Sequence, residues 1–118
     1  EEGGMSKRKG LKLKFGNTER GFAAVGFVDR YGAECSIQKS SIADDDAIWF
    51  GVNDADPQIM ASQAADHGVA TKATCGWVKY PVPDEVLLNT RMHLTRRQVE
   101  DLLPILIHFV ETGEVPTA

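Results

Sequence analysis

The chain has 118 residues, of which 42% are hydrophobic and 25% are charged, and its formal net charge is −4. This length fits a single domain, and this composition is ordinary for a globular protein. The acidic balance argues against extended binding to duplex DNA, and no apolar run approaches the roughly 20 residues that a membrane span needs. We therefore expect neither a membrane protein nor a duplex-binding protein.

The N-terminal segment is rich in lysine and arginine. Residues 1–10 are interpreted as a flexible basic leader, of which residues 1–4, preceding Met5, are taken as an expression remnant. Residues 11–118 are expected to form a single α+β domain.

The first half of the chain shows the alternation that is typical of β-strands. Strands are predicted at 11–15, 22–28 and 33–40, and a type I turn at 29–32 joins the last two into a hairpin. Residues 47–52 are apolar at most positions, which predicts a central strand with both faces covered.

The segment 53–88 is predicted to be an insertion in this sheet. Asp56 as a cap and Pro57 at the first helical position indicate a short helix over 57–67, and Gly68 would end it. Further short strands are predicted at 86–88 and 91–94.

The C-terminal helix is predicted at 95–112. Thr95 and Gln98 have the spacing of a capping box. Pro104 removes a backbone donor in mid-helix, so a kink is expected there. One helix face carries an apolar stripe, composed of Val99, Leu102, Leu103, Leu106, Phe109 and Val110. The predicted fold class is α+β: a small antiparallel sheet of about four to five strands, with this helix covering one face and a short helical insertion.

Several segments resemble a family of small uncharacterised proteins encoded by bacteriophages and prophages. They are FVDRYG (27–32), CSIQKSS (35–41), IWFGV (48–52), GWVKYP (76–81), RMHLTRRQ (91–98), LLP (102–104) and FVETG (109–113). The resemblance implies a phage or prophage origin and, after infection, a location in the bacterial cytoplasm. Some relatives link the strand at Trp49 to the strand at Arg91 more directly, which implies that 53–88 elaborates a common core.

The sequence gives no reason to assign a catalytic residue, a metal or a cofactor. The potential soft ligands have none of the paired spacings of a zinc site; they are Cys35, Cys75, His67, His93 and His108. No nucleophile elbow, P-loop or HExxH motif is present. One enzymatic alternative stays open, a small hydrolase with Cys35 and His93 as a dyad, if their strands are neighbours.

A set of aromatic and basic residues predicts a ligand site. Aromatic rings stack on bases, and cations hold phosphates, so the set suits a nucleotide or a single strand. The alternative is that Trp49 belongs to the core and that 77–83 packs over the sheet. The predicted ligand-binding residues are Trp77, Lys79, Tyr80, Arg91, His93 and Arg97.

Ile105 and Ile107 point away from the apolar stripe, which predicts a partner surface and a homodimer. The leading functional hypothesis is a non-enzymatic phage accessory protein that antagonises host antiviral defence, by sequestering a nucleotide signal. One alternative is an inhibitor or adaptor that binds a host defence protein without a small ligand, and the other is the hydrolase.

Overall fold

The computed structural model describes residues 10–117, so most of the predicted basic leader (residues 1–9) lies outside the described residues. The chain divides into two compact units. The first unit combines Glu1–Asn53 with Arg91–Ala118, and the second unit is Asp54–Thr90. The second unit has nearly the bounds of the segment 53–88 that was predicted as an insertion.

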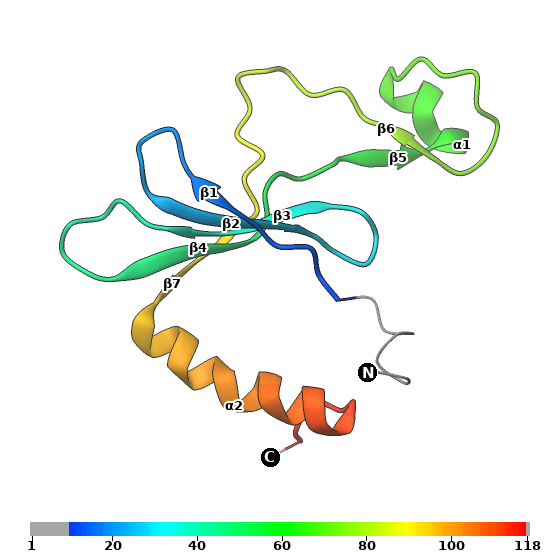
Figure 1. Cartoon of the computed structure of the whole chain (residues 1–118). Coiled ribbons are helices and arrows are strands. Elements are labelled where there is room, and N and C mark those ends of the chain that lie inside the picture. The colour runs from blue at the N-terminus through cyan, green and yellow to red at the C-terminus, as the bar shows by residue number, and fades with distance from the viewer. Residues whose placement is uncertain (1–9, 118) are drawn as a thin grey trace. The chain divides into compact units, whose positions relative to one another are not determined.

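The first unit is built on an antiparallel sheet of five strands (Figure 1). Their order is β1 (Lys14–Asn17), β2 (Ala23–Val28), β3 (Glu34–Lys39), β4 (Ala47–Val52) and β7 (Met92–Thr95). With a C-terminal helix and a short helical insertion, the predicted α+β fold class is confirmed. The predicted β2–β3 hairpin is also present, and the Asp29 carboxylate accepts bonds from the backbone N–H groups of Tyr31 and Ala33 at its turn.

The register of the strands gives the sheet two chemically different faces. Paired residues point to the same side, and successive residues alternate between sides. The apolar face carries Phe15, Val25, Phe27, Cys35, Ile37, Ile48, Phe50, Met92 and Leu94. The polar face carries Ser36, Gln38, Trp49 and His93. β4 lies between β3 and β7, as expected of a central strand, and its Trp49 projects among the polar side chains of this second face.

The C-terminal helix is α2 (Arg96–Thr112), which agrees with the prediction of 95–112 to within a residue. Thr95 is the N-cap, and its side chain and that of Gln98 form the predicted capping box. The helix is continuous through Pro104. Gly113 ends it in the left-handed conformation (φ 78°) and donates its N–H to the carbonyl of Phe109.

The helix α2 leaves its apolar stripe in solvent. No described residue of α2 is buried, and the exposed fraction of the large stripe residues runs from 40% at Leu102 to 77% at Val110. Among the described elements, the contacts of α2 are concentrated on β7. The structure therefore differs from the expectation that this helix covers one face of the sheet.

The first turn of α2 bonds to the residue that precedes β4. The backbone N–H of Arg96 donates to the carbonyl of Asp46 at 3.2 Å, and the Arg96 guanidinium lies 3.3 Å from the Asp46 carboxylate. These bonds hold the N-terminal end of the helix against the start of β4. An open groove of about 760 Å³ remains, whose apolar walls are Ile48 and Leu94 of the sheet and Val99 and Leu103 of α2. We call it the α2 groove.

The second unit contains a two-stranded antiparallel sheet of β5 (Gln58–Met60) and β6 (Trp77–Lys79). Between them lie the short helices α1 (Ala61–Ala64) and η2 (Ala65–His67). The predicted stop at Gly68 is confirmed, because its φ is 73° and its N–H bonds to the carbonyl of Ala65.

Two predictions in this unit are wrong. Residues 58–60 form a strand instead of the first turn of a helix, since they pair with β6, and the Asp56 carboxylate accepts a bond from the Gln58 amide. Residues 86–88 form no strand, and the nearest pairing is a bridge between Asp54 and Asn89. At 58–60 long-range pairing, which local patterns do not encode, decided the outcome.

The capping box of α2 provides a test of this helix. Replacing Thr95 by Ala removes the oxygen that accepts the Gln98 N–H bond, and we expect the free energy of unfolding to fall by about 1 kcal/mol. The Thr95→Ser variant keeps that oxygen and should lose much less. Urea unfolding followed by circular dichroism measures both variants, and equal losses would contradict the capping role.

Candidate functional site

The polar face of the sheet brings an indole, an imidazole and a guanidinium together. Trp49 and His93 are register neighbours in β4 and β7, and their rings stack with centroids 4.1 Å apart and planes 10° from parallel. Arg91 precedes His93 by two residues, and its guanidinium carbon lies 5.8 Å from the centroid of the Trp49 ring. A cation at this distance from an indole is attracted by the negative charge of the ring face. We call these three residues the Trp49 cluster.

Ser40 holds the imidazole of this cluster in place. Its hydroxyl lies 2.9 Å from Nε2 of His93, and it also accepts the backbone N–H of Ile42. Ser40 is buried, whereas His93 is exposed. A ligand can therefore reach the imidazole of His93 but not the hydroxyl of Ser40. The buried hydroxyl is inaccessible as a nucleophile, and its contact with Nε2 orients the imidazole instead.

A second group of polar side chains extends along the same face. The Ser36 hydroxyl lies 2.6 Å from Oδ1 of Asn53, and the Gln38 amide nitrogen lies 3.1 Å from the Ser36 hydroxyl. Gln38 is the register neighbour of Trp49. These three residues were not predicted, although the alternation of Ser36 and Gln38 with apolar neighbours in β3 was a visible signal. The sequence alone does not show the register between β3 and β4, which places Gln38 beside Trp49.

The predicted ligand residues fall into both units. Arg91 and His93 are in the first unit, within the Trp49 cluster. Trp77 and Lys79 belong to β6 of the second unit, and Tyr80 follows it. The Trp77 side chain is 65% exposed, so it does not belong to a core.

Arg97, the sixth predicted residue, is paired within its own helix. Its Nε lies 3.2 Å from the carboxylate of Asp101 and 3.8 Å from that of Glu100. These exposed pairs contribute little stability, but they balance much of the local charge. The Arg97 guanidinium therefore already has two carboxylate partners.

The Cys35–His93 dyad is contradicted by the register. Cys35 lies on the apolar face, whereas His93 lies on the polar face, so the sheet itself separates the two side chains. The Cys35 thiol donates to the carbonyl of Ala33. Burial, with a smaller contribution from the negative charge of Asp29, raises the pKa of this thiol and disfavours the nucleophilic thiolate.

Residues 10–117 contain no group of three acidic, histidine or cysteine side chains arranged to hold a metal ion. No helix among them is both long and apolar enough to cross a bilayer.

Comparison of the chain with protein-family models, with curated proteins and with solved structures gave no match. The resemblance to phage proteins therefore stays a prediction.

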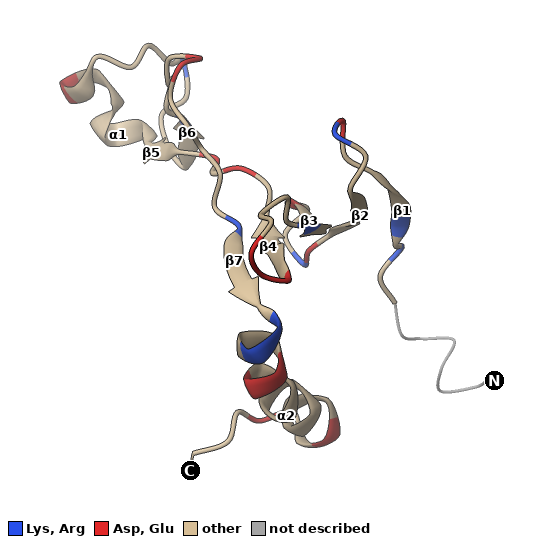
Figure 2. Cartoon of the chain, turned by 90° about the vertical axis from the view of Figure 1, so that its left-hand side faces the viewer, with Lys and Arg blue, Asp and Glu red and all other residues tan. Residues whose placement is uncertain are grey.

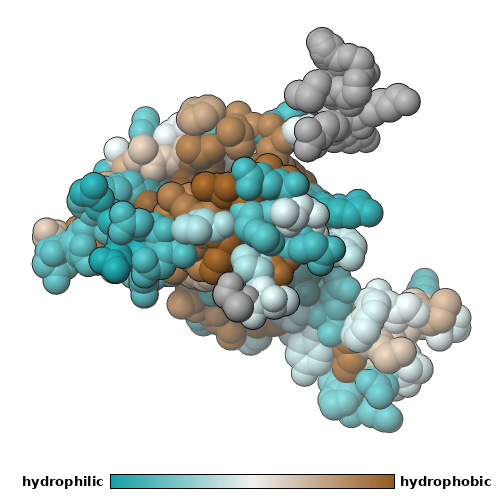
Figure 3. All heavy atoms as spheres, turned by 90° about the horizontal axis from the view of Figure 1, so that it is seen from below, coloured by the Kyte–Doolittle hydropathy of each residue, from teal (hydrophilic) through white to brown (hydrophobic). Residues whose placement is uncertain are grey.

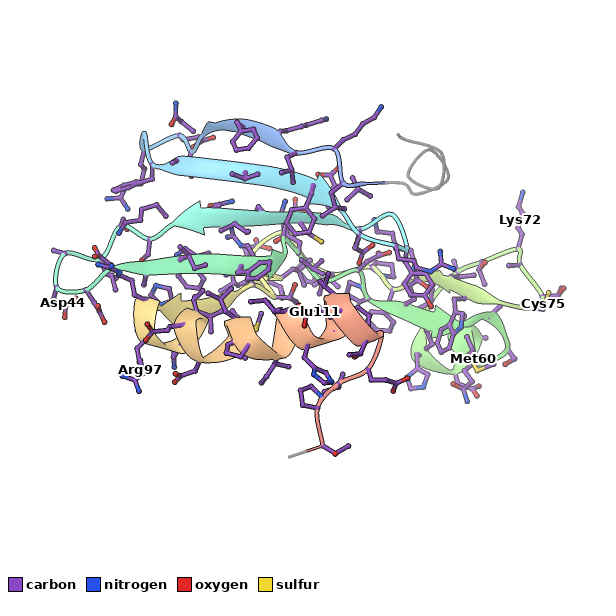
Figure 4. All side chains as sticks on the ribbon, turned by 60° about the horizontal axis from the view of Figure 1, so that its bottom comes forward. Asp44, Met60, Lys72, Cys75, Arg97 and Glu111 are labelled. Carbon is purple, nitrogen blue, oxygen red and sulfur yellow. The ribbon has the colours of Figure 1, made fainter. Side chains whose placement is uncertain are left out.

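The two cysteines should differ strongly in reactivity. Cys35 is buried and has a raised pKa, whereas Cys75 is exposed in the segment between η2 and β6 (Figure 4). With iodoacetamide at pH 7.5, we expect Cys75 to be alkylated first and Cys35 at least tenfold more slowly. Raising the pH should accelerate alkylation of Cys35 only as its thiolate forms, and denaturant should abolish the difference. Peptide mass spectrometry measures both sites, and equal rates in the folded protein would refute this assignment.

Proposed function

We propose that this chain is a non-enzymatic accessory protein of a phage or prophage that antagonises host antiviral defence by sequestering a nucleotide signal. The observation that carries the proposal is the Trp49 cluster, in which a stacked aromatic pair and a guanidinium occur together on the polar face. The phage origin rests on the sequence resemblance.

The chemistry of the cluster suits a nucleotide. The exposed imidazole of His93, backed by the Trp49 indole, offers a flat surface on which a base can stack, a contact worth roughly 1–3 kcal/mol per base. Arg91 supplies a forked donor that matches a phosphate. The hydroxyl of Ser40 fixes the orientation of the imidazole, so little freedom of this ring is lost on binding.

The second unit provides a separate aromatic and basic surface. Trp77, Lys79 and Tyr80 are exposed within four consecutive positions. Exposed aromatic residues often anchor a partner protein, so this segment can contact a host protein as well as a small ligand. The exposure of Trp77 favours the alternative function, an inhibitor or adaptor of a host defence protein that needs no small ligand. The hydrolase with a Cys35–His93 dyad is not proposed, since those residues lie on opposite faces.

Titration calorimetry of the full chain with a panel of cyclic mono-, di- and trinucleotides tests the proposal. We expect at least one member to bind, and Arg91→Ala and His93→Ala to weaken that binding at least tenfold. Arg30→Ala removes an exposed arginine in the β2–β3 turn of the first unit and serves as the matched control. Trp77→Ala and Tyr80→Ala report separately whether the second unit takes part.

Absence of heat with every nucleotide would exclude sequestration and favour the adaptor.

A test in cells measures the plating efficiency of a phage on bacteria that carry a nucleotide-signalled defence. Expression of the wild-type chain should raise it, and expression of the Arg91→Ala variant should not.

A further inference from the structure

The polar face of the sheet continues beyond the Trp49 cluster. The register places Gln38 beside Trp49, and Ala24 beside Gln38. Gly16 of β1 is paired with Ala24 in turn, so one row of neighbours crosses from β4 to the edge of the sheet. Adjacent strands lie about 4.8 Å apart, so this row extends about 14 Å past Trp49. A ligand stacked on the cluster can therefore continue along the sheet.

A hollow of about 820 Å³ lies over the far part of this row. The other side of the first unit, where α2 lies, is chemically different, since apolar residues gather there (Figure 3). Pockets that bind small molecules typically have volumes of roughly 300–1,000 Å³, so the hollow has room for a whole ligand group. We call it the β1–β3 hollow. Its lining includes Gly16, Ala24, Gly26, Ser36, Gln38 and Asn53, all of the first unit.

Three polar side chains lie where the β1–β3 hollow meets the Trp49 cluster. The hydroxyl of Ser36, a residue only 4% exposed, lies 2.6 Å from Oδ1 of Asn53 and accepts from the amide nitrogen of Gln38 at 3.1 Å. The buried hydroxyl thus holds two half-buried carboxamides in place. Each carboxamide keeps further donor and acceptor capacity. The edge of a nucleobase also combines donors and acceptors, so the two amides can hydrogen-bond a base.

The charged residues that line the hollow are mainly basic. They are Lys12, Lys14 and Glu34, two cations against one anion, which leaves a net charge of +1. The basic residues of β1 and of the segment before it can be followed in Figure 2. An ammonium group at this edge of the sheet can hold a phosphate. Arg91 adjoins the opposite edge strand, β7, so cations lie at both ends of the polar face.

We propose that the polar face binds a dinucleotide, with one base stacked on the Trp49 cluster and the second nucleoside in the β1–β3 hollow. The base of this second nucleoside bonds to the carboxamides of Gln38 and Asn53, and the phosphates lie within reach of Arg91 and Lys14. The inference rests on the proposed function and specifies the size of its ligand. A mononucleotide on the cluster would leave the hollow empty, whereas a second nucleoside would cross Gln38 and fill it.

Titration calorimetry of the full chain tests this size. The probes are AMP, GMP, and the linear and cyclic dinucleotides of adenine and guanine. We expect the best dinucleotide to bind about tenfold or more tightly than the best mononucleotide, because only a dinucleotide fills both places. Tighter binding of a cyclic form would identify the ligand as a signal molecule, and tighter binding of a linear form would identify it as a single strand.

The outcomes separate this inference from the function on which it rests. Equal affinities for mono- and dinucleotides would overturn the inference and leave nucleotide sequestration standing. A complete lack of binding by mono- and dinucleotides would overturn both.

A substitution that fills the hollow tests its place. A Cβ built on Gly26 has its nearest neighbour, the carbonyl oxygen of Cys35, at 3.8 Å, so a side chain fits there and projects among the lining residues. We expect Gly26→Leu to weaken dinucleotide binding about tenfold or more. Ala23→Leu places the same side chain on the opposite face of β2 and should bind as the wild type does. Undiminished binding by a folded Gly26→Leu variant would overturn the proposal.

A second variant removes a ligand contact without filling the hollow. Asn53→Ala should lower the ratio of dinucleotide to mononucleotide affinity about fivefold, because a hydrogen-bonding amide is lost at the second base only. Circular dichroism verifies the fold of each variant, and Asn53→Ala decides the question if Gly26→Leu does not fold. An unchanged ratio would show that the second nucleoside does not lie in the hollow.

Discussion

The pairing of β4 with β7 is the constraint on which the rest of the first unit depends. It joins Ala47–Val52 to Met92–Thr95, two strands that are separated in sequence by the whole second unit. Closing such a loop costs conformational entropy, which the ladder and the packing of Ile48 against Leu94 must offset. The same pairing stacks Trp49 on His93 and sets the point from which α2 begins.

Local patterns were sufficient for the elements whose partners are close in sequence. The β2–β3 hairpin and the capping box of α2 depend on residues only a few positions apart, and both were predicted with nearly correct bounds. The helix expected at Pro57 was displaced because Gln58–Met60 pairs with Trp77–Lys79. Helix signals at Asp56 and Pro57 carry no information about that distant strand.

The site was predictable only in part, for the same reason. Arg91 and His93 were identified because aromatic and basic residues gather in that region of the sequence. Their contact with Trp49 depends on the register between β4 and β7, which no local pattern sets. The alternation of β3 could have shown that Cys35 and Ser36 face opposite sides, but only the register of β7 shows that His93 lies with Ser36.

The alternation of β7 also separates two surfaces of the first unit, the Trp49 cluster and the α2 groove. Arg91 and His93 lie beside Trp49 on the polar face. Met92 and Leu94 project to the apolar face, where Leu94 lines the α2 groove. One short strand thus contributes to the Trp49 cluster on one side of the sheet and to the α2 groove on the other. Substitutions on α2 can therefore change the α2 groove without touching the imidazole.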